Sequence, residues 1–231
     1  MATQYANGKI VTDGLVLSLN AADRNSYPGS GTTWSDTSGN GNTPTLYNGA
    51  TFSTDFGGII GFDGTNDFGE TSTNSTNIIS TLTMESWFKA NGTPAGGFHV
   101  MFQKEGGFSG GSVYGLRAVP SNTFYAMICY DAQVASQNLL YSTTTLTNGV
   151  WYYVASTFDS SYNWKIYING VLENSSTLSA VPFQNSATIN VGRGDSRYTN
   201  GNIASVRVYN RALSSSEILQ NYNAQKSRFG L

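Results

Sequence analysis

A single cysteine, Cys129, leaves this chain of 231 residues without any possible internal disulfide. Cys129 lies in the apolar-rich run 124–130. Because a free cysteine usually packs as a small buried hydrophobe, we expect a thiol in the core there and not a nucleophile or a metal ligand.

Charged residues are also scarce, at 11% of the chain, and the formal net charge is -2. The twelve lysine and arginine residues are scattered along the sequence. Proteins that bind nucleic acid usually carry a broad basic surface, so this composition argues against a nucleic-acid partner.

Long hydrophobic runs are missing as well. No apolar run approaches the roughly 20 residues that cross a bilayer. The first dozen residues have neither the apolar centre nor the cleavage site of a signal peptide. We therefore expect a protein that is made in a cytoplasm and is not inserted into a membrane.

Glycine, asparagine, serine and threonine are abundant, and aromatic residues reach 13% of the chain. This composition suits short strands connected by tight turns, and it predicts an all-β, two-sheet antiparallel sandwich. We expect one domain over residues 13–231 after a polar N-terminal arm, residues 1–12, that anchors it to a neighbouring subunit. The runs that read as strands are 15–19, 45–48, 58–62, 68–73, 82–90, 98–104, 113–119, 123–130, 150–158, 163–168, 171–177, 188–191 and 203–209.

One segment near the end of the chain predicts a helix. Ser214 and Glu217 have the spacing of a capping box, and Leu213 and Ile218 have that of a hydrophobic staple. The strand at 203–209, which we expect the core to cover on one face only, therefore leads into one short C-terminal helix.

Asn169 and Gly170 separate two strand-type runs. An Asn-Gly pair accepts the positive φ angles of a type I′ turn. The two runs are therefore predicted to form a hairpin in which Ile168 lies opposite Val171.

Four segments of the sequence carry a family resemblance: DTSGNGN at 36–42, FDGTNDF at 62–68, LTMESWFKA at 82–90 and GNIASVRVYNRALSSSEI at 201–218. In this order they resemble the laminin-G-like jelly roll of the concanavalin A-like lectin and glucanase superfamily. The resemblance extends from Gly14 over nearly the whole chain. Residues 13–42 and 220–231 are also similar to stand-alone versions encoded among structural genes of tailed bacteriophages. That similarity implies a virion surface module that contacts glycans or other virion proteins.

The resemblance also bears on metal binding. The family often holds a calcium ion with help from an aspartate in its last strand, where this chain has Ala204. The best remaining Ca²⁺ candidate is Asp36, Ser38 and Asn40, which have the spacing of the first half of an EF-hand loop. Position 12 of that loop is Tyr47 and not glutamate, so any Ca²⁺ would bind weakly and we expect no required cofactor. The alternative is an Asx-rich turn whose side chains bond their own backbone.

Hydrolytic chemistry finds little support in the sequence. Residues 107–111 have the Gly-x-Ser-x-Gly spacing of a nucleophile elbow, but the base should follow the serine and His99 precedes it. We expect His99 to be a strand residue. A glycosidase needs two acids about 5 to 10 Å apart, whereas Glu85, Glu105 and Glu173 are each solitary on their strands. We therefore expect no enzyme.

The candidate ligand-binding side chains are aromatic residues on predicted loops: Tyr27, Trp34, Phe108, Tyr162 and Tyr198. Aromatic faces stack on sugar rings, while amides and carboxylates bond the hydroxyl groups. Loops at the rim of a sandwich are where such groups meet. The alternative is that these rings only fix their loops to the sandwich. The integrin-type tripeptide at 193–195 lies on a predicted loop near Tyr198. Because tripeptides recur by chance, it is weak support for adhesion.

Together these features favour a non-enzymatic surface protein of a tailed-bacteriophage virion, as a head decoration or on the tail. Its partners would be capsid or tail proteins and host-surface glycans, with many copies raising a weak affinity by ~10² to 10⁴. The alternatives are a cellular carbohydrate-binding or adhesion domain and, third, a glycan hydrolase.

Overall fold

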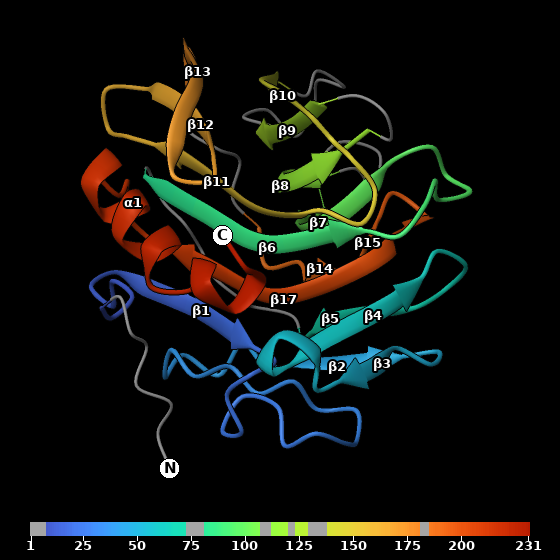
Figure 1. Ribbon diagram of the computed structural model, residues 1–231. Helices are drawn as coiled ribbons and strands as arrows, with labels where there is room; N and C mark the ends of the chain where they lie inside the picture. The colour runs from blue at the N-terminus through green and yellow to red at the C-terminus, as the bar shows by residue number, and fades with distance from the viewer. Residues whose placement is uncertain (1–7, 73–80, 107–111, 120–122, 129–137, 181–184) are drawn as a thin grey trace.

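The computed structural model describes residues 8–72, 81–106, 112–119, 123–128, 138–180 and 185–231. Two antiparallel sheets stack face to face in this part of the chain, and one short helix, α1 (Ser215–Asn223), follows the last strand (Figure 1). The predicted all-β sandwich with a C-terminal helix is therefore confirmed. Cys129 and the elbow-like run 107–111 lie outside the described residues.

The first sheet has eight strands in the order β13-β12-β11-β6-β17-β4-β3, and β1 also pairs with β17. The predicted hairpin is confirmed, because Ile168 pairs with Val171 and both turn residues, Asn169 and Gly170, have positive φ. The strands are β1 (Leu15–Asn20), β3 (Thr51–Ser53), β4 (Ile59–Asp63), β6 (Leu82–Ala90), β11 (Trp151–Phe158), β12 (Asn163–Ile168), β13 (Val171–Thr177) and β17 (Asn200–Tyr209).

The second sheet has seven strands in the order β10-β9-β8-β7-β14-β5-β2. Sequence periodicity did not predict β3 or β10, because β3 is very short and only alternate residues of β10 are buried. The strands are β2 (Pro44–Tyr47), β5 (Phe68–Thr71), β7 (His99–Glu105), β8 (Ser112–Ala118), β9 (Thr123–Ile128), β10 (Asn138–Thr145) and β14 (Ile189–Val191).

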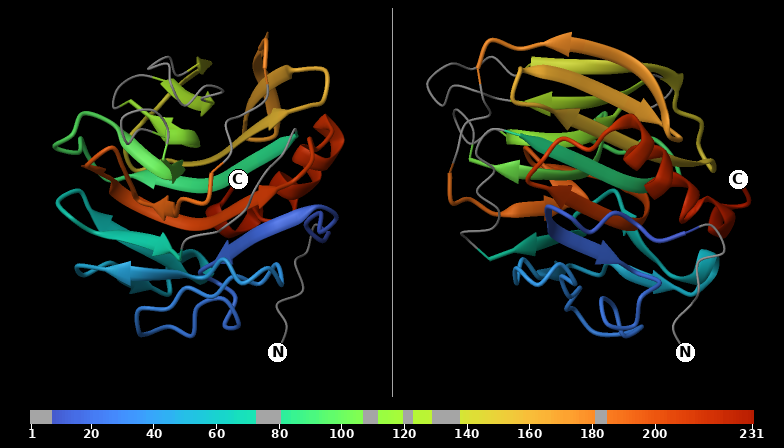
Figure 2. Two further views of the ribbon diagram at one scale, coloured as in Figure 1. Left: turned by 180° about the vertical axis from the view of Figure 1, so that it is seen from behind. Right: turned by 90° about the vertical axis from the view of Figure 1, so that its left-hand side faces the viewer.

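The main core lies between the sheets, as the two layers in Figure 2 show. Alternate residues of each strand point into it because successive side chains of a strand face opposite ways. In β8 and β9, for example, Leu116 and Ala126 are buried partners, and Leu46 and Val191 lie further along the same inner face.

Strand β17 is buried on both faces, so the expectation of a half-covered strand is wrong. Val206 and Val208 face the main core, whereas Ala204 and Tyr209 face a second core that the C-terminal segment covers. A short 3-10 helix, η3 (Lys226–Phe229), completes that cover, and Phe229 stacks on Trp87 at 4.2 Å between ring centroids. Position 204 is therefore packed among apolar groups.

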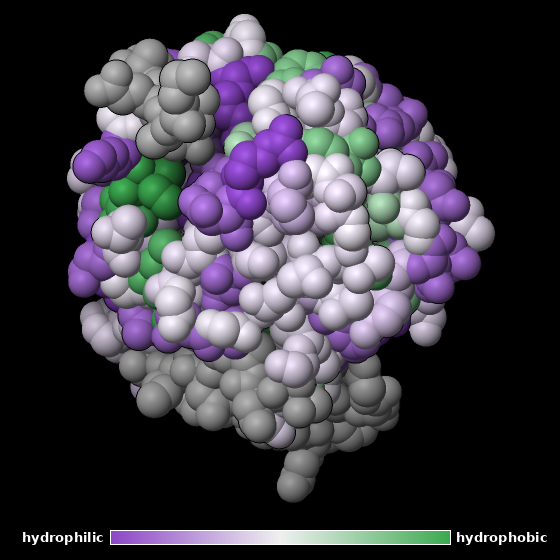
Figure 3. All heavy atoms as spheres, turned by 90° about the horizontal axis from the view of Figure 1, so that it is seen from below, coloured by the Kyte–Doolittle hydropathy of each residue, from purple (hydrophilic) through white to green (hydrophobic). Residues whose placement is uncertain are grey.

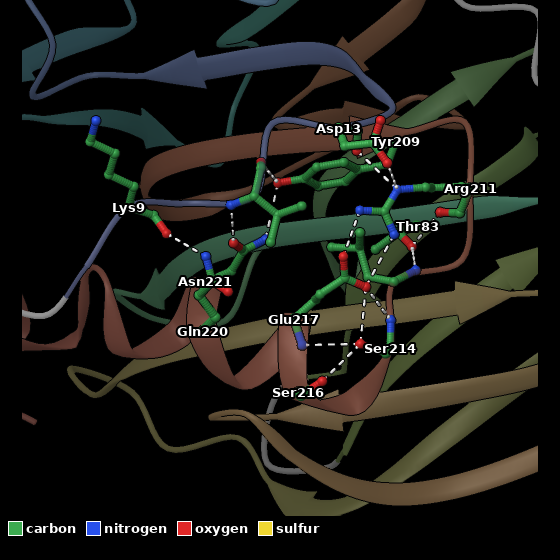
Figure 4. Close-up of polar contacts among 12 residues, drawn as sticks. Lys9, Asp13, Thr83, Tyr209, Arg211, Ser214, Ser216, Glu217, Gln220 and Asn221 are labelled. Atoms are coloured by element: carbon green, nitrogen blue, oxygen red, sulfur yellow. Dashed lines mark hydrogen bonds and ion pairs between the residues drawn. The ribbon is translucent and has the colours of Figure 1, made fainter.

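The predicted capping box of α1 is confirmed (Figure 4). Ser214 Oγ accepts from the Glu217 amide, and Glu217 Oε2 accepts from the Ser214 amide at 2.8 Å. Arg211 donates to the same carboxylate at 2.6 Å and lowers the pKa of Glu217 to about 2. Leu213 and Ile218 are both buried in the second core, as the staple spacing requires.

The N-terminal segment is fastened to this helix, so the boundary of the predicted arm moves toward the N-terminus. Gln220 donates to the Lys9 carbonyl at 2.8 Å, and the Val11 amide donates to Asn221 Oδ1 at 2.8 Å (Figure 4). Tyr209 also donates to the Val11 carbonyl at 3.0 Å. Residues 9–11 thus belong to the domain.

A charged cluster lies beneath α1. Glu85 and Arg207 form an ion pair at 2.8 Å, and both side chains are almost completely buried. Tyr153 and Asn221 donate to Glu85 Oε2 at 2.5 and 2.9 Å. These contacts exclude Glu85 as the catalytic acid of a hydrolase, because its carboxylate faces the interior and not a ligand.

The lower face of the molecule, shown in Figure 3, is mainly hydrophilic or neutral, with hydrophobic residues in small separate areas. Within the described ranges, no helix has the length and apolar character needed to cross a membrane.

Candidate functional site

The candidate site surrounds a hairpin on the outer face of the seven-stranded sheet, the face turned away from the main core. Its strands, β15 (Arg193–Gly194) and β16 (Arg197–Tyr198), pair with each other, and β15 lies beside β7 (Figure 1). The turn residues Asp195 and Ser196 have φ angles of 50° and 60°. Two consecutive angles of this kind are typical of a tight type I′ hairpin turn, and each costs a non-glycine residue about 1–3 kcal/mol. The sequence predicted only a loop here.

Gly194 allows this hairpin to lie flat on the sheet. A Cβ atom added at Gly194 would overlap the side chain of Gln103, which is fully buried beneath it. The hairpin therefore covers the middle of the outer face.

Arg117, which is 3% exposed, ties the turn of the hairpin to the sheet. Its Nη2 lies 2.5 Å from Asp195 Oδ2, and its Nε donates to Gln103 Oε1 at 3.1 Å. The guanidinium also lies 4.7 Å from the ring centroid of Phe98. A buried charge costs several kcal/mol unless partners of this kind compensate it.

Glu105 extends the same polar network. Gln103 and Asn190 donate to Glu105 Oε1 at 2.8 and 2.7 Å. Burial raises the pKa of Glu105; its hydrogen bonds oppose this effect, and the negative charge of Asp195 adds to it. Two carboxyl groups from distant parts of the chain thus share one site.

Arg193 holds the opposite side of the hairpin. It lies 3.8 Å from the ring centroid of Phe68 and 3.2 Å from Glu70 Oε1. Because Arg193 and Asp195 are both engaged with the sheet and only 23% and 21% exposed, the geometry argues against adhesion through the tripeptide at 193–195.

Exposed aromatic rings lie at both ends of this outer face. Tyr47 stacks on Phe68 at 4.9 Å, and Tyr141 packs on Tyr125 at 5.3 Å between ring centroids. Tyr125 in turn pairs with Arg117 on the next strand. Tyr47 is 41% exposed and Tyr141 is 43% exposed. We call these rings and the two arginines between them the aromatic strip: Tyr47, Phe68, Arg193, Arg117, Tyr125 and Tyr141.

Two hollows flank the hairpin. The first, of about 300 Å³, is lined by Glu105, Arg193, Asp195, Ser196 and Tyr198. The second, of about 380 Å³, lies between the hairpin and residues 64–65 and 95–96. Tyr198 lines both, and its ring is 6.4 Å from Phe68. The predicted ligand-binding residue Tyr198 therefore lies at the centre of the site.

The other predicted aromatic residues do not join Tyr198. Trp34 and Tyr27 are buried in the main core, so the prediction that they present a face to ligand is wrong. Their loop folds back across the sandwich, where the Trp34 amide bonds the Pro44 carbonyl. Tyr162 is 38% exposed, but it belongs to the β11–β12 turn of the other sheet. Phe108 lies outside the described residues.

The predicted metal ligands form the alternative structure, an Asx-rich turn. Asp36 Oδ1 accepts from the amides of Ser18 and Ser38, each at 2.9 Å. Asp36 Oδ2 accepts from Ser38 Oγ at 2.8 Å and from the Asn42 amide at 2.9 Å. Asn40 donates to the Leu15 carbonyl. The only carboxylate of the loop is thus occupied in holding the loop against β1, which argues against calcium there.

Sequence reasoning missed most of the site. It treated Glu105 as solitary because it looked for acids on one strand, whereas the partner, Asp195, comes from a distant hairpin. The exposed alternate residues of β10 and β2, Tyr141 and Tyr47, were a usable signal, since aromatic residues on the polar face of a strand are candidates for binding.

Comparison with known families gives one match. The laminin-G-type profile described as "Concanavalin A-like lectin/glucanases superfamily" matches residues 63–219. This range covers the FDGTNDF turn, the aromatic residues of β8 to β10 and the hairpin, up to the first turns of α1. No curated protein sequence matches the chain.

Several solved structures share the fold. The binding domain of Paraclostridial Mosquitocidal Protein 1 aligns with a TM-score of 0.71 and 15% identity over 92% of this chain and 52% of that one. The receptor-binding domain of botulinum neurotoxin C/D mosaic serotype aligns with a TM-score of 0.71 and 16% identity over 93% of this chain and 52% of that chain. Trypanosoma rangeli sialidase in complex with sialic acid aligns with a TM-score of 0.69 and 16% identity over 96% of this chain and 34% of that chain. The chain thus spans about half the length of the toxin domains, and the likeness is one of fold.

Proposed function

Because this chain belongs to the concanavalin A-like lectin/glucanase superfamily, we propose that it is a non-enzymatic carbohydrate-binding protein whose ligand lies along the aromatic strip. The observation that carries the proposal is the pairing of exposed aromatic rings with polar groups on one sheet face. Tyr47 and Tyr141 offer flat apolar surfaces on the same sheet face, and Tyr198 lines the two hollows beside the hairpin. Sugar rings present both apolar faces and hydroxyl groups, so they suit such a surface.

Substitution of the exposed rings tests this function. We expect Tyr141→Ala and Tyr198→Ala each to weaken oligosaccharide binding about tenfold, because a lost aromatic contact of about 1.4 kcal/mol corresponds to that factor. Binding is measured on a glycan array and then by titration with the strongest ligand. Tyr162→Ala is the matched control for Tyr141→Ala, since Tyr162 is similarly exposed and lies on the other sheet, whereas Tyr198 is half-buried. An array without any bound glycan would contradict the proposal.

Glycan hydrolysis is the second candidate function, because Glu105 and Asp195 line one hollow. Burial raises the pKa of Glu105, as in a general acid, but two side-chain amides already bond its Oε1. We expect no turnover of a polysaccharide panel. Turnover that disappears in Glu105→Gln, with Glu173→Gln as the control, would replace the non-enzymatic function.

We propose further that the protein is located on the surface of a tailed-phage virion, in the head or tail, in many copies. Support comes from residues 13–42 and 220–231, which resemble stand-alone phage versions of this domain. Mass spectrometry of purified particles is the test. Absence from particles would favour the alternative, a cellular adhesion domain.

Truncation separates anchoring from folding. We expect removal of residues 1–7 to release the protein from particles without changing its melting temperature. Removal of residues 1–12 should also destabilise the domain by about 1–3 kcal/mol, because Asn221 and Tyr209 lose their bonds to Val11. Retention of both truncated forms in particles would exclude this segment as the anchor.

A further inference from the structure

A third hollow, of about 440 Å³, lies at the end of the eight-stranded sheet. We call it the asparagine hollow, because its wall carries Asn48, Asn91, Asn200, Asn202, Asp63 and Asp67. None of the described residues that line it is a lysine, arginine or histidine, and none of them lines either hollow beside the hairpin. The asparagine hollow is thus a separate site that carries only acidic charge among its described residues, whereas an arginine lines each hollow beside the hairpin.

Asp67 provides a buried acceptor in this wall. It is 4% exposed, and its Oδ2 accepts from the Asp63 amide at 3.1 Å. Its Oδ1 accepts no hydrogen bond from the described part of the chain, and it lies beside Gly49, another lining residue. Burial raises the pKa of Asp67. A hydrogen bond from a hydroxyl group stabilises a carboxylate oxygen in a mostly buried position.

Side-chain amides that line the same hollow provide donors. Asn202 donates to Asn91 Oδ1 at 2.8 Å, which orients that amide and leaves Asn91 Nδ2 available. The backbone N–H of Asn91 donates to the backbone carbonyl of Asn200 at 3.0 Å. The side chains of these two residues therefore start from adjacent positions. The side chain of Asn200 makes no hydrogen bond to any described residue.

The floor of the hollow is kept open by Gly61. A Cβ atom added there would lie 2.8 Å from Thr51 Oγ1, closer than real Cβ atoms come, and 3.2 Å from Asn202 Oδ1, a tight contact. Any larger residue would therefore crowd Thr51 and Asn202, which also line the hollow.

We propose that the asparagine hollow binds one ring of a neutral sugar through neighbouring hydroxyl groups. Asp67 accepts from the hydroxyl hydrogens, and Asn91 and Asn200 donate to the hydroxyl oxygens. An acidic sugar is disfavoured because Asp63 and Asp67 are the only charged groups among the described residues that line the hollow. The inference rests on the proposed carbohydrate-binding function, to which it adds a subsite apart from the aromatic strip.

The test uses methyl glycosides of neutral sugars and of glucuronic acid, with binding measured by saturation-transfer NMR and titration. We expect at least one neutral glycoside to bind and the glucuronide not to bind. Asp67→Asn preserves an acceptor for the Asp63 amide but removes the carboxylate, and we expect it to weaken binding about tenfold, as should Asn200→Ala. Asp55→Asn and Asn25→Ala are matched controls at exposed positions outside the hollow.

The outcomes separate this subsite from the general function. Oligosaccharide binding that depends on Tyr141 but not on Asp67 would overturn the subsite and leave the proposed function standing. Binding of the glucuronide in preference to neutral glycosides would also overturn it. If no glycan binds at either place, both proposals are wrong. A crystal soaked with the neutral glycoside should show the ring beside Asp67, and an empty hollow would contradict the inference.

Discussion

Replacement of Arg207 by methionine should lower the free energy of unfolding by about 3–5 kcal/mol, the usual cost of leaving a buried charge without its partner. Arg207 and Glu85 are almost completely buried beneath α1, 2.8 Å apart. The negative charge of Glu85 raises the pKa of Arg207 against the effect of burial. Without the guanidinium, Glu85 keeps the neutral donors Tyr153 and Asn221 and no cation from the described part of the chain.

Denaturant unfolding of three further variants distinguishes this mechanism from simple loss of packing. The double variant Glu85→Gln with Arg207→Met should lose less stability than Arg207→Met alone, since it buries no charge and keeps an acceptor for Tyr153. Arg211→Met removes an arginine whose ion pairs are partly exposed, and should cost less than about 1 kcal/mol. Equal destabilisation by Arg207→Met and the double variant would show that lost packing, and not an unpaired charge, is responsible.

Acidification should destabilise the protein through His99. Burial lowers the pKa of His99 to about 4, whereas the unfolded chain titrates near 6.5. As the pH falls below about 6.5, His99 binds a proton in the unfolded state but not in the folded state. Stability is therefore lost between pH 6.5 and 4, by about 3 kcal/mol in total. Unfolding curves at a series of pH values measure this loss.

His99→Leu is the matched variant for this prediction. Neither ring nitrogen of His99 has a hydrogen-bond partner within the described residues, and the ring packs on Phe88. The leucine variant should therefore be at least as stable as the natural chain at pH 7 and should lose less stability toward pH 4. Glu105 and Asp67, whose pKa values burial raises, oppose the effect equally in both proteins. Parallel pH profiles for the two proteins would contradict the assignment.

Local sequence patterns predicted the elements that depend on neighbours in the chain. The capping box of Ser214 and Glu217 and the type I′ turn at Asn169 and Gly170 each involve residues at most three positions apart. Alternation of side chains predicted most of the strands for the same reason. The weakest signals were missed, namely the short β3 and the alternately exposed β10.

The direction of loop aromatics was not predictable in this way. Trp34 and Tyr198 both lie in polar, glycine-rich segments, yet Trp34 is in the main core and Tyr198 lines the hollows of the candidate site. Which way such a ring turns depends on the sheet that its loop meets. That sheet is assembled from strands far away in the sequence.

The sequence by itself therefore determined the sandwich and its closing helix. Strand periodicity can be read along a short stretch of chain, and turns and helix caps depend on residues that are close in sequence. Only the tertiary structure decided which side chains meet in the candidate sites. Arg117 pairs with Asp195, and Asp67 and Asn91 line one hollow, because the fold brings distant segments together. No spacing rule along one strand contains those pairs, since each forms only when the topology places the two segments side by side.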